Sequence, residues 1–240
     1  MVDAATHGVR GAVIVTGTDT GVGKTTVTAA ISAAASAAGL AVAVVKPCQT
    51  GTAVETQSDA ETVARLAAPA FVTTLESYPE PLAPLTAARI AGQPAIGLDA
   101  VVDTVRTLQS LHDLVLIEGA GGVLVPMGSN GWTVIDLAMA LLAPAVVVVR
   151  AGLGTLNHTA LARLPLARKG IRDFIVIGEW PAEPALVHRT NLRDLPVLSG
   201  ALPERAGAMA ADDFRRLAPE WLTPDLHGHL QPASLTALGL

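Results

Sequence analysis

The chain has 240 residues, half of them hydrophobic, and a formal net charge of −5 at pH 7. An acidic balance without a basic run argues against a nucleic-acid surface. The longest apolar candidate for a membrane span, residues 138–149, is too short and is interrupted by Pro144, and residues 1–10 lack the apolar region of a secretory signal. A single cysteine, Cys48, excludes an internal disulfide framework and is interpreted as a small packed hydrophobe. We therefore expect a cytoplasmic protein without membrane or nucleic-acid partners.

Predicted strands and helices alternate along the chain. The first strand leads through a glycine-rich turn into an alanine-rich helix that stops at Gly39. Ser58 and Glu61 have the spacing of a capping box, which predicts a helix start. The predicted strands cover residues 11–16, 41–45, 114–117, 145–149, 174–177 and 196–198. The predicted helices cover residues 25–38, 58–66, 85–91, 98–110, 133–142 and 154–169, with a short one after Pro184.

Several stretches are expected to be irregular. Residues 46–51 are predicted as a loop because a proline and a glycine punctuate them, and residues 78–84 as a proline-rich loop. No element is assigned to residues 67–77. Residues 223–240 contain prolines and glycines and are predicted as a flexible or packing tail.

The alternation of strands and helices predicts one α/β domain over residues 1–240, built on a doubly wound, mostly parallel sheet. Ligands in such folds bind beyond the carboxyl ends of the strands. Lys24, Lys46, Glu118 and Gly154 each follow a predicted strand. We therefore expect the ligand site to form at that edge of the sheet.

The most informative turn is Gly17-Thr18-Asp19-Thr20-Gly21-Val22-Gly23-Lys24-Thr25, between a predicted strand and a predicted helix. Glycines let backbone N–H groups converge on phosphate oxygens, and the helix N-terminus adds partial positive charge. Lys24 would reach the β- and γ-phosphates, and the Thr25 hydroxyl would ligate Mg²⁺. Five residues rather than four separate Gly17 from Gly23, so the turn is a lengthened P-loop. The alternative, a chance Gly-Lys-Thr, is disfavoured by the flanking strand and helix.

Lysine is scarce in this chain, which contains only Lys24, Lys46 and Lys169 and otherwise uses arginine. The first two follow the first two predicted strands. A compact ammonium and a planar guanidinium are not interchangeable, so lysine at these turns indicates that a point charge is required. The alternative for Lys46 is a surface lysine at a strand end.

Several segments, in this order and spacing, resemble the dethiobiotin synthetase family from about Val13 to Pro203. The Gly-Lys-Thr turn alone is generic to P-loop NTPases, whereas the combination is specific to this family. The resemblance implies a P-loop NTPase fold of the nitrogenase-iron-protein and MinD-like type. The matching segments are the lengthened P-loop, Lys46-Pro47-Cys48-Gln49-Thr50-Gly51, Ser58-Asp59, Tyr78-Pro79-Glu80-Pro81-Leu82-Ala83-Pro84, Glu118-Gly119-Ala120-Gly121-Gly122 and Gly152-Leu153-Gly154-Thr155-Leu156-Asn157-His158.

The resemblance implies an ATP- and Mg²⁺-dependent ligase of biotin biosynthesis that forms C–N bonds and closes a ring. CO₂ adds to one amine of 7,8-diaminopelargonic acid to give a carbamate, and the carbamate oxygen attacks the γ-phosphate of ATP. The product of that step is a carbamic–phosphoric anhydride. The second amine then closes the ureido ring, and the products are dethiobiotin, ADP and phosphate.

The resemblance also implies which residues do this work, in a homodimer. Lys46, Lys24 and Thr20 are catalytic, and Thr25, Asp59 and Glu118 hold Mg²⁺. An acid at a helix N-terminus, favoured by the helix dipole, is the alternative for Asp59. Nucleotide binding falls to Gly21, Val22, Gly23, Lys24, Thr25, Thr26, Asp59, Glu118, Gly119, Ala120, Gly121, Gly178, Glu179, Leu202 and Pro203. Substrate binding falls to Thr50 and, across the dimer interface, to Gly154, Thr155, Leu156 and Asn157.

One position departs from the family pattern. Many members carry Asn-Asp after the strand that corresponds to residues 174–177, and the Asn reads the adenine edge; here the residues are Gly178 and Glu179. Because glycine has no amide side chain, the base must be read by backbone groups or by Leu202, Pro203 and the following residues. We predict relaxed nucleotide choice, with CTP or GTP binding comparably to ATP.

Two other functions share this pattern of elements. A ParA- or MinD-like switch ATPase would carry an extra lysine early in the P-loop, where this chain has Thr18-Asp19-Thr20. A cobyrinate-type amidoligase would need an amide-nitrogen source, usually a glutaminase with a catalytic cysteine, whereas Cys48 lies beside Lys46. His158 is interpreted as a structural residue, and no Ser/His/Asp arrangement or zinc-binding His cluster is visible.

Overall fold

The computed structural model describes residues 8–231, in which seven strands form one sheet in the order β3-β2-β4-β1-β5-β6-β7. Each strand pairs in parallel with its neighbours, which confirms the predicted α/β class. The strands are β1 (Gly11–Gly17), β2 (Val42–Thr50), β3 (Phe71–Tyr78), β4 (Leu114–Gly122), β5 (Ala145–Val149), β6 (Asp173–Trp180) and β7 (Leu198–Pro203). The helices are α1 (Lys24–Ala37), α2 (Asp59–Ala67), α3 (Pro84–Ala91), α4 (Leu98–Gln109), α5 (Val134–Leu141), α6 (Thr155–Arg168), α7 (Leu186–Asp194) and α8 (Ala211–Leu217).

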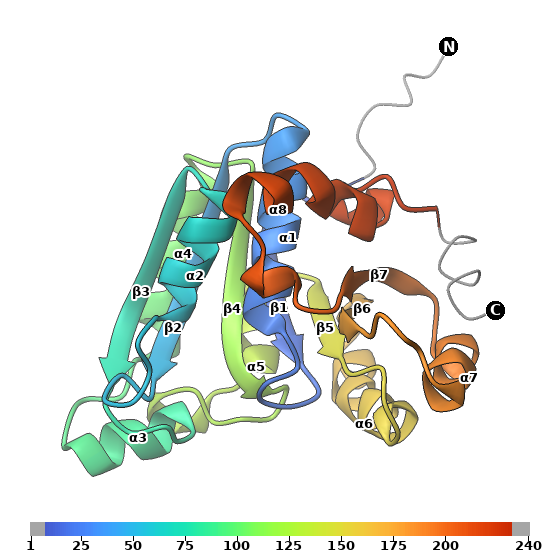
Figure 1. The fold of residues 1–240 in the computed structure, drawn as a ribbon. Helices are drawn as coiled ribbons and strands as arrows, with labels where there is room; N and C mark the ends of the chain where they lie inside the picture. The colour runs from blue at the N-terminus through green and yellow to red at the C-terminus, as the bar shows by residue number, and fades with distance from the viewer. Residues whose placement is uncertain (1–7, 232–240) are drawn as a thin grey trace.

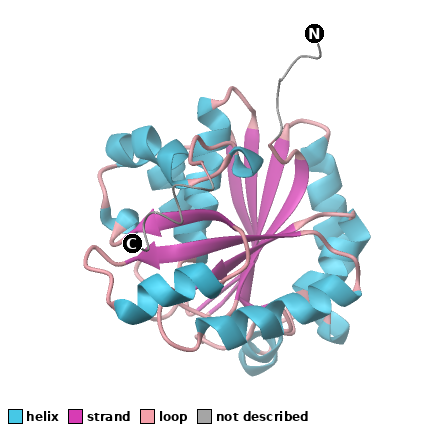
Figure 2. Cartoon of the chain, turned by 90° about the vertical axis from the view of Figure 1, so that its right-hand side faces the viewer, coloured by secondary structure: helices cyan, strands magenta, loops and turns pink. Residues whose placement is uncertain are grey.

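Helices cover both faces of the sheet. Helices α1, α2 and α8 pack on one face, and α4, α5 and α6 pack on the other. Figure 1 shows the first group in front of the sheet and α4 and α5 behind it, and Figure 2 shows helices on either side of the twisted strands. The fold is therefore doubly wound, as predicted.

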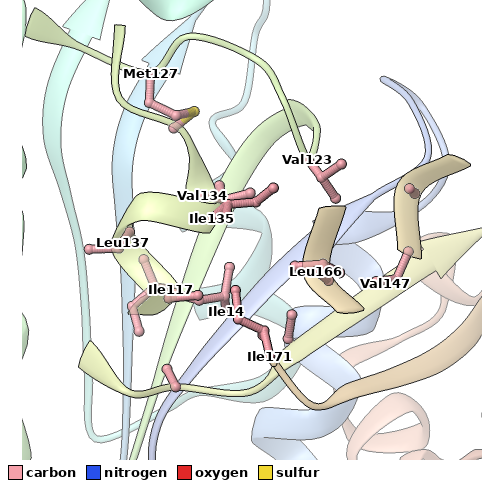
Figure 3. Close-up of a cluster of buried hydrophobic side chains, with 14 of the residues drawn as sticks. Ile14, Ile117, Val123, Met127, Val134, Ile135, Leu137, Val147, Leu166 and Ile171 are labelled. Atoms are coloured by element: carbon pink, nitrogen blue, oxygen red, sulfur yellow. The ribbon is translucent and has the colours of Figure 1, made fainter. Parts of the chain in front are cut away.

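The strands supply side chains to two hydrophobic clusters, one under each layer of helices. Successive residues of a strand point to opposite faces, so in β1 Ile14 belongs to one cluster and Val13 and Val15 to the other. Figure 3 shows Ile14 and Ile117 packed with Val134 and Ile135 of α5. This burial on both faces holds β1, and the turn that follows it, at the centre of the sheet.

Helix α1 lies close against the sheet. Ten of its fourteen residues are buried, and most of those are alanine or other small residues. The helix begins at Lys24, directly after Gly23, which has a φ of 94°. A left-handed φ is costly for residues with a Cβ, so glycine at this position lets the turn enter the helix without strain.

The predicted loop over residues 46–51 is wrong, because strand β2 continues through Thr50. Beyond Val45 the strand has no pairing with β4 and pairs with β3 alone, from Lys46 beside Thr74 to Thr50 beside Tyr78. A proline is tolerated in a strand that is paired on one side only. Lys46 consequently sits on a strand rather than in a loop, with its backbone fixed on one side.

The sequence prediction also misses β3 and misplaces β7. Strand β3 lies at the sheet edge and is largely half-exposed, so it lacks the apolar run of a central strand. The last strand was predicted at residues 196–198, but β7 runs through Ser199, Gly200 and Ala201. Glycine is required at position 200 because a Cβ there would lie 2.7 Å from the carbonyl oxygen of Trp221.

The predicted capping box at the start of α2 is confirmed. The Ser58 hydroxyl accepts a hydrogen bond from the Glu61 backbone N–H, and the Glu61 carboxylate accepts one from the Ser58 N–H at 2.7 Å. This box fixes the first turn of α2 and therefore the position of Asp59. Part of the predicted tail, residues 223–231, packs against the domain with Leu226 fully buried; the remainder lies outside the described residues.

Replacing Ser58 by alanine is expected to lower the free energy of unfolding by about 1 kcal/mol, because the Glu61 N–H loses its acceptor. Urea denaturation would measure the change. Thr104→Ala in the middle of α4 is the matched control, since its hydroxyl donates only to the carbonyl of Ala100, within the same helix. Equal stability losses in the two variants would contradict the role of the cap.

Within residues 8–231, no helix is both long and apolar enough to cross a bilayer.

Candidate active site

The P-loop occupies the carboxyl end of β1, between the ends of β4 and β5. Its lysine, Lys24, is buried, and its ammonium donates a hydrogen bond to the backbone carbonyl of Asp19 at 2.9 Å. Burial lowers the pKa of Lys24, and the neighbouring charge of Lys46 lowers it further. Both effects reflect two ammonium groups confined to one small site, an arrangement that favours anionic ligands.

Lys46 lies in the same site, on the adjacent part of β2. Its ammonium contacts the carboxylate of Asp59 at 2.5 Å and that of Glu118 at 2.9 Å, and it donates to the carbonyl of Gly119 at 3.2 Å. Lys46 and Glu118 are 5% and 1% exposed, respectively. The structure thus rules out the surface lysine that was the alternative for Lys46.

The charge on Lys46 is permanent near neutral pH. Burial by itself would lower the pKa of Lys46, but the carboxylates of Glu118 and Asp59 outweigh it and raise the pKa above that of free lysine. The same ion pair lowers the pKa of Asp59 against the opposing effect of its burial. Lys46 is therefore suited to stabilise negative charge and unsuited to accept a proton.

Thr25 joins the two carboxylates. Its hydroxyl oxygen lies 2.6 Å from Asp59 Oδ1 and 2.9 Å from Glu118 Oε1. A hydroxyl has a single proton and can donate to one of these carboxylates at a time. The three oxygens are hard ligands on one side of the site, and this donor set fits Mg²⁺, which uses a few protein oxygens and keeps several waters. The structure therefore brings the three predicted metal ligands together.

Two cavities adjoin the P-loop, and Gly21, Gly23 and Thr26 line both of them. The first, called the β6 cavity, has a volume of about 520 Å³ and lies between the P-loop and the ends of β6 and β7. The second, called the β2 cavity, has a volume of about 760 Å³ and lies between the P-loop and the end of β2. Both volumes are in the range of small-molecule sites. Lys24, Lys46, Asp59 and Glu118 all line the β2 cavity.

The chain is similar to known proteins over most of its length. A profile of the AAA domain family matches residues 11–211. An ATP-dependent dethiobiotin synthetase of Rhodococcus jostii is 52% identical over 87% of this chain and 93% of its own length. Its counterpart in Streptomyces avermitilis is 49% identical over 90% of this chain and 93% of its own length.

The chain belongs to the dethiobiotin synthetase family. Solved structures show the same fold at much lower identity. The MinC:MinD cell division complex of Aquifex aeolicus matches with a TM-score of 0.52 at 13% identity, covering 87% of this chain and 86% of that one. The cell division ATPase MinD of Pyrococcus furiosus matches with a TM-score of 0.50 at 19% identity, covering 88% and 98%. These matches confirm the predicted MinD-like P-loop NTPase fold.

Most predicted nucleotide and substrate residues of this dethiobiotin synthetase family member lie at the two cavities. Thr20, Thr25, Thr50, Ala120 and Gly121 line the β2 cavity, and Glu179 and Pro203 line the β6 cavity. Leu202 does not line either cavity: it is fully buried in the core beneath α1 and α8. Cys48 is buried as predicted, and burial, reinforced by the charge of Glu76, raises the pKa of its thiol to about 12.

The four predicted residues at the start of α6 are not part of either cavity. Gly154 has a φ of 92° and Thr155 is buried, whereas Leu156 and Asn157 are exposed. The Thr155 hydroxyl has no hydrogen-bond partner among the described residues. A single copy of the chain thus does not bring these residues to Lys46.

Gly178 lies against the P-loop. A Cβ at this position would be 1.9 Å from the carbonyl oxygen of Val22, so no side chain fits here without moving the loop. The next residue, Glu179, accepts a hydrogen bond from the Arg205 N–H at 3.1 Å. The polar groups at this end of the β6 cavity therefore come from residues 179, 204 and 205 and from His188.

Sequence reasoning missed several residues that line these cavities. Arg150 donates a hydrogen bond to the P-loop carbonyl of Thr20 at 2.9 Å, and His188 reaches the β6 cavity from α7. Gln49 and Glu55 line the β2 cavity. Among these, only Gln49 lies inside a segment that the family resemblance had marked. The others are single polar residues in turns or on an exposed helix, where the sequence carries no periodic signal.

Proposed function

We propose that this chain is an ATP- and Mg²⁺-dependent ligase that carboxylates 7,8-diaminopelargonic acid with CO₂ and closes the ureido ring of dethiobiotin. ADP and phosphate are the other products. The observation that carries this proposal is the buried Lys46 ammonium, which faces the same cavity as the P-loop Lys24. A simple nucleotide hydrolase has no need of a second buried lysine on a neighbouring strand.

Each of the two lysines stabilises a different anion of the reaction. Lys24 neutralises the β- and γ-phosphates of ATP. Lys46 stabilises the carbamate formed when the first amine adds to CO₂ and loses a proton, and it also contacts the γ-phosphate. Bringing two anions together is the main electrostatic obstacle to transfer of the phosphoryl group, and fixed cations lower it. The carbamate oxygen then displaces ADP from the γ-phosphorus, which gives the carbamic–phosphoric anhydride.

Ring closure follows from the same arrangement. The second amine attacks the carbamate carbon as the free base and loses an N–H proton, and phosphate leaves with the electrons of the broken C–O bond. Thr50, at the end of β2, binds the substrate near its amines, and Thr20 lines the same cavity from the P-loop. Thr25, Asp59 and Glu118 would hold Mg²⁺, which supplies additional positive charge to the phosphates when bound.

The substrate carboxylate is proposed to bind at the N-terminus of α6 of a second copy, so that the active unit is a homodimer. Backbone N–H groups at a helix N-terminus suit a carboxylate. Support comes from large exposed apolar side chains on and just before α6: Leu153 is 91% exposed, and Leu161 and Leu164 are 58% and 47% exposed. A shared interface would cover this surface and complete each site.

Nucleotide choice is expected to be relaxed. Gly178 offers no side chain to the base, and a side chain there is excluded by Val22. We expect the dissociation constants for ATP, CTP and GTP to fall within about tenfold of one another, a spread of about 1.4 kcal/mol. Isothermal titration calorimetry with each triphosphate and Mg²⁺ would measure them. A hundredfold preference for ATP would refute this prediction.

A turnover assay tests the proposed function. The chain is incubated with diaminopelargonate, bicarbonate and Mg²⁺–ATP, and dethiobiotin is sought by mass spectrometry. Omission of bicarbonate is the control, because CO₂ supplies the ring carbon. Formation of dethiobiotin supports the ligase, and its absence at high protein concentration would refute it. ATP hydrolysis without the diamine would instead favour the switch-ATPase alternative.

A further inference from the structure

Five charged side chains line the β2 cavity, and their pairing is uneven. Lys46 is bound to two carboxylates, those of Asp59 and Glu118. The other two charged residues are Lys24 and Glu55. Glu55 has no ion pair with a lysine, arginine or histidine in residues 8–231. Glu55 is therefore the carboxylate of this cavity that remains available to a cationic ligand.

The position of Glu55 is set by its neighbours. It lies in the turn between β2 and α2, where its backbone N–H donates to the carbonyl of Gly51 at 2.9 Å. Its carboxylate accepts a hydrogen bond from the side-chain amide of Gln49 at 2.9 Å. A Cβ built on Gly51 would lie 3.5 Å from the Glu55 carboxyl group, so the carboxylate rests against the end of β2.

The orientation of the Gln49 amide is also determined. Gln49 is 4% exposed, and its side-chain oxygen accepts from the backbone N–H of Asp59 at 3.1 Å. A backbone N–H can only donate, so the oxygen must face Asp59 and the NH₂ group must face Glu55. Gln49 thus connects Glu55 to Asp59, the residue that is ion-paired with Lys46.

We propose that Glu55 binds the ammonium form of one substrate amine and thereby sorts the two nitrogens of the diamine. This inference rests on the proposed function. An aliphatic amine is protonated near neutral pH, as lysine is. Lys24 and Lys46 repel such a cation, and Asp59 and Glu118 are already paired. The nitrogen that becomes the anionic carbamate lies at Lys46, and the second nitrogen is held at Glu55.

This arrangement makes Glu55 a specificity-determining residue. A charge-assisted hydrogen bond between the ammonium and the carboxylate fixes which nitrogen of the substrate lies at Glu55 and which lies at Lys46. A ligand of the same length without amines gains nothing from Glu55. The nucleotide phosphates, which bind on the P-loop side, do not need it.

The test uses Glu55→Gln, which keeps the size and the hydrogen-bonding oxygen but removes the charge, and Glu55→Asp, which restores the charge. Glu80→Gln is the matched control, because Glu80 is exposed, as Glu55 is, but does not line the cavity. We measure the KM for diaminopelargonate, the dissociation constant for Mg²⁺–ATP, and the affinity for 8-aminopelargonic and pelargonic acids by calorimetry.

We expect Glu55→Gln to raise the KM for the diamine at least tenfold with unchanged ATP affinity. It should also abolish the tighter binding of 8-aminopelargonic acid relative to pelargonic acid. Glu55→Asp should partly restore the KM and this binding preference, and Glu80→Gln should match the unmodified chain. A KM within twofold, or equal losses for the ligands with and without an amine, would overturn this inference alone. Absence of dethiobiotin from the unmodified chain would instead overturn the proposed function and this inference with it.

Discussion

Replacing Lys46 by alanine is expected to reduce turnover by about a hundred- to a thousandfold, the usual cost of removing one preorganised group that stabilises developing charge. The affinity for Mg²⁺–ATP should change much less, because Lys24 and the P-loop backbone remain. Rates of dethiobiotin formation and calorimetric nucleotide binding would separate these effects. Lys169→Ala is the control, since Lys169 is exposed at the end of α6. An active Lys46→Ala variant would remove Lys46 from the catalytic set.

The same variant has a second consequence, for stability. Glu118 is 1% exposed, and it loses the ammonium that compensates its charge. Breaking a buried ion pair from one side costs about 3–5 kcal/mol, which a domain of ordinary stability survives. We expect Mg²⁺ to raise the thermal midpoint of Lys46→Ala more than that of the unmodified chain, because a cation between Asp59 and Glu118 replaces the lost charge. Equal effects of Mg²⁺ would argue against that carboxylate pair as the metal site.

Gly178→Ala is expected to have the other large effect. Its Cβ would lie 1.9 Å from the carbonyl oxygen of Val22 and 2.8 Å from a methyl group of Val148. Overpacking of this kind costs about 3 kcal/mol when the neighbour is backbone. The thermal midpoint should fall by roughly 6–12 °C for a domain of this size. Nucleotide binding should weaken about tenfold to a hundredfold, because the P-loop must shift.

Gly152→Ala provides the matched control for this prediction. Gly152 also lines the β6 cavity, but a Cβ there meets nothing within 4 Å. Neither glycine has a left-handed φ, so the two substitutions differ in contact rather than in backbone strain. If both variants bound nucleotide equally well, the contact between Gly178 and Val22 would not be what positions the P-loop.

The sequence predicts those parts of this fold that depend on local signals. The P-loop, the capping box at Ser58 and the buried strand β5 each have a pattern of their own, and all three are confirmed. The extension of β2 through Pro47 has no such signal, since it depends on pairing with β3 on one side only. Strand β7 likewise contains a glycine, Gly200, whose requirement depends on the Trp221 carbonyl, 21 residues later in the chain.

The candidate site divides in a similar way. Lys24 begins α1 after the turn that follows β1, and Lys46 and Glu118 lie within β2 and β4. The topology of a parallel sheet brings groups toward the carboxyl ends of neighbouring strands together. Glu55 could not be found from the sequence, because its position depends on the orientation of the Gln49 amide. Leu202 is predicted to contact the base, but β7 continues through Pro203, so Leu202 is a strand residue whose side chain is buried in the core with residues of α1 and α8.

The alanines of α1 act as a spacer between that helix and the sheet. Methyl groups on the buried side set how closely the helix axis approaches the strands, and Lys24 and Thr25 are carried at its first turn. The height of the phosphate-binding loop above β1 is therefore fixed by side-chain size several turns away. In this chain, the buried alanines of α1 therefore help to set the position of the P-loop as well as to fill the core.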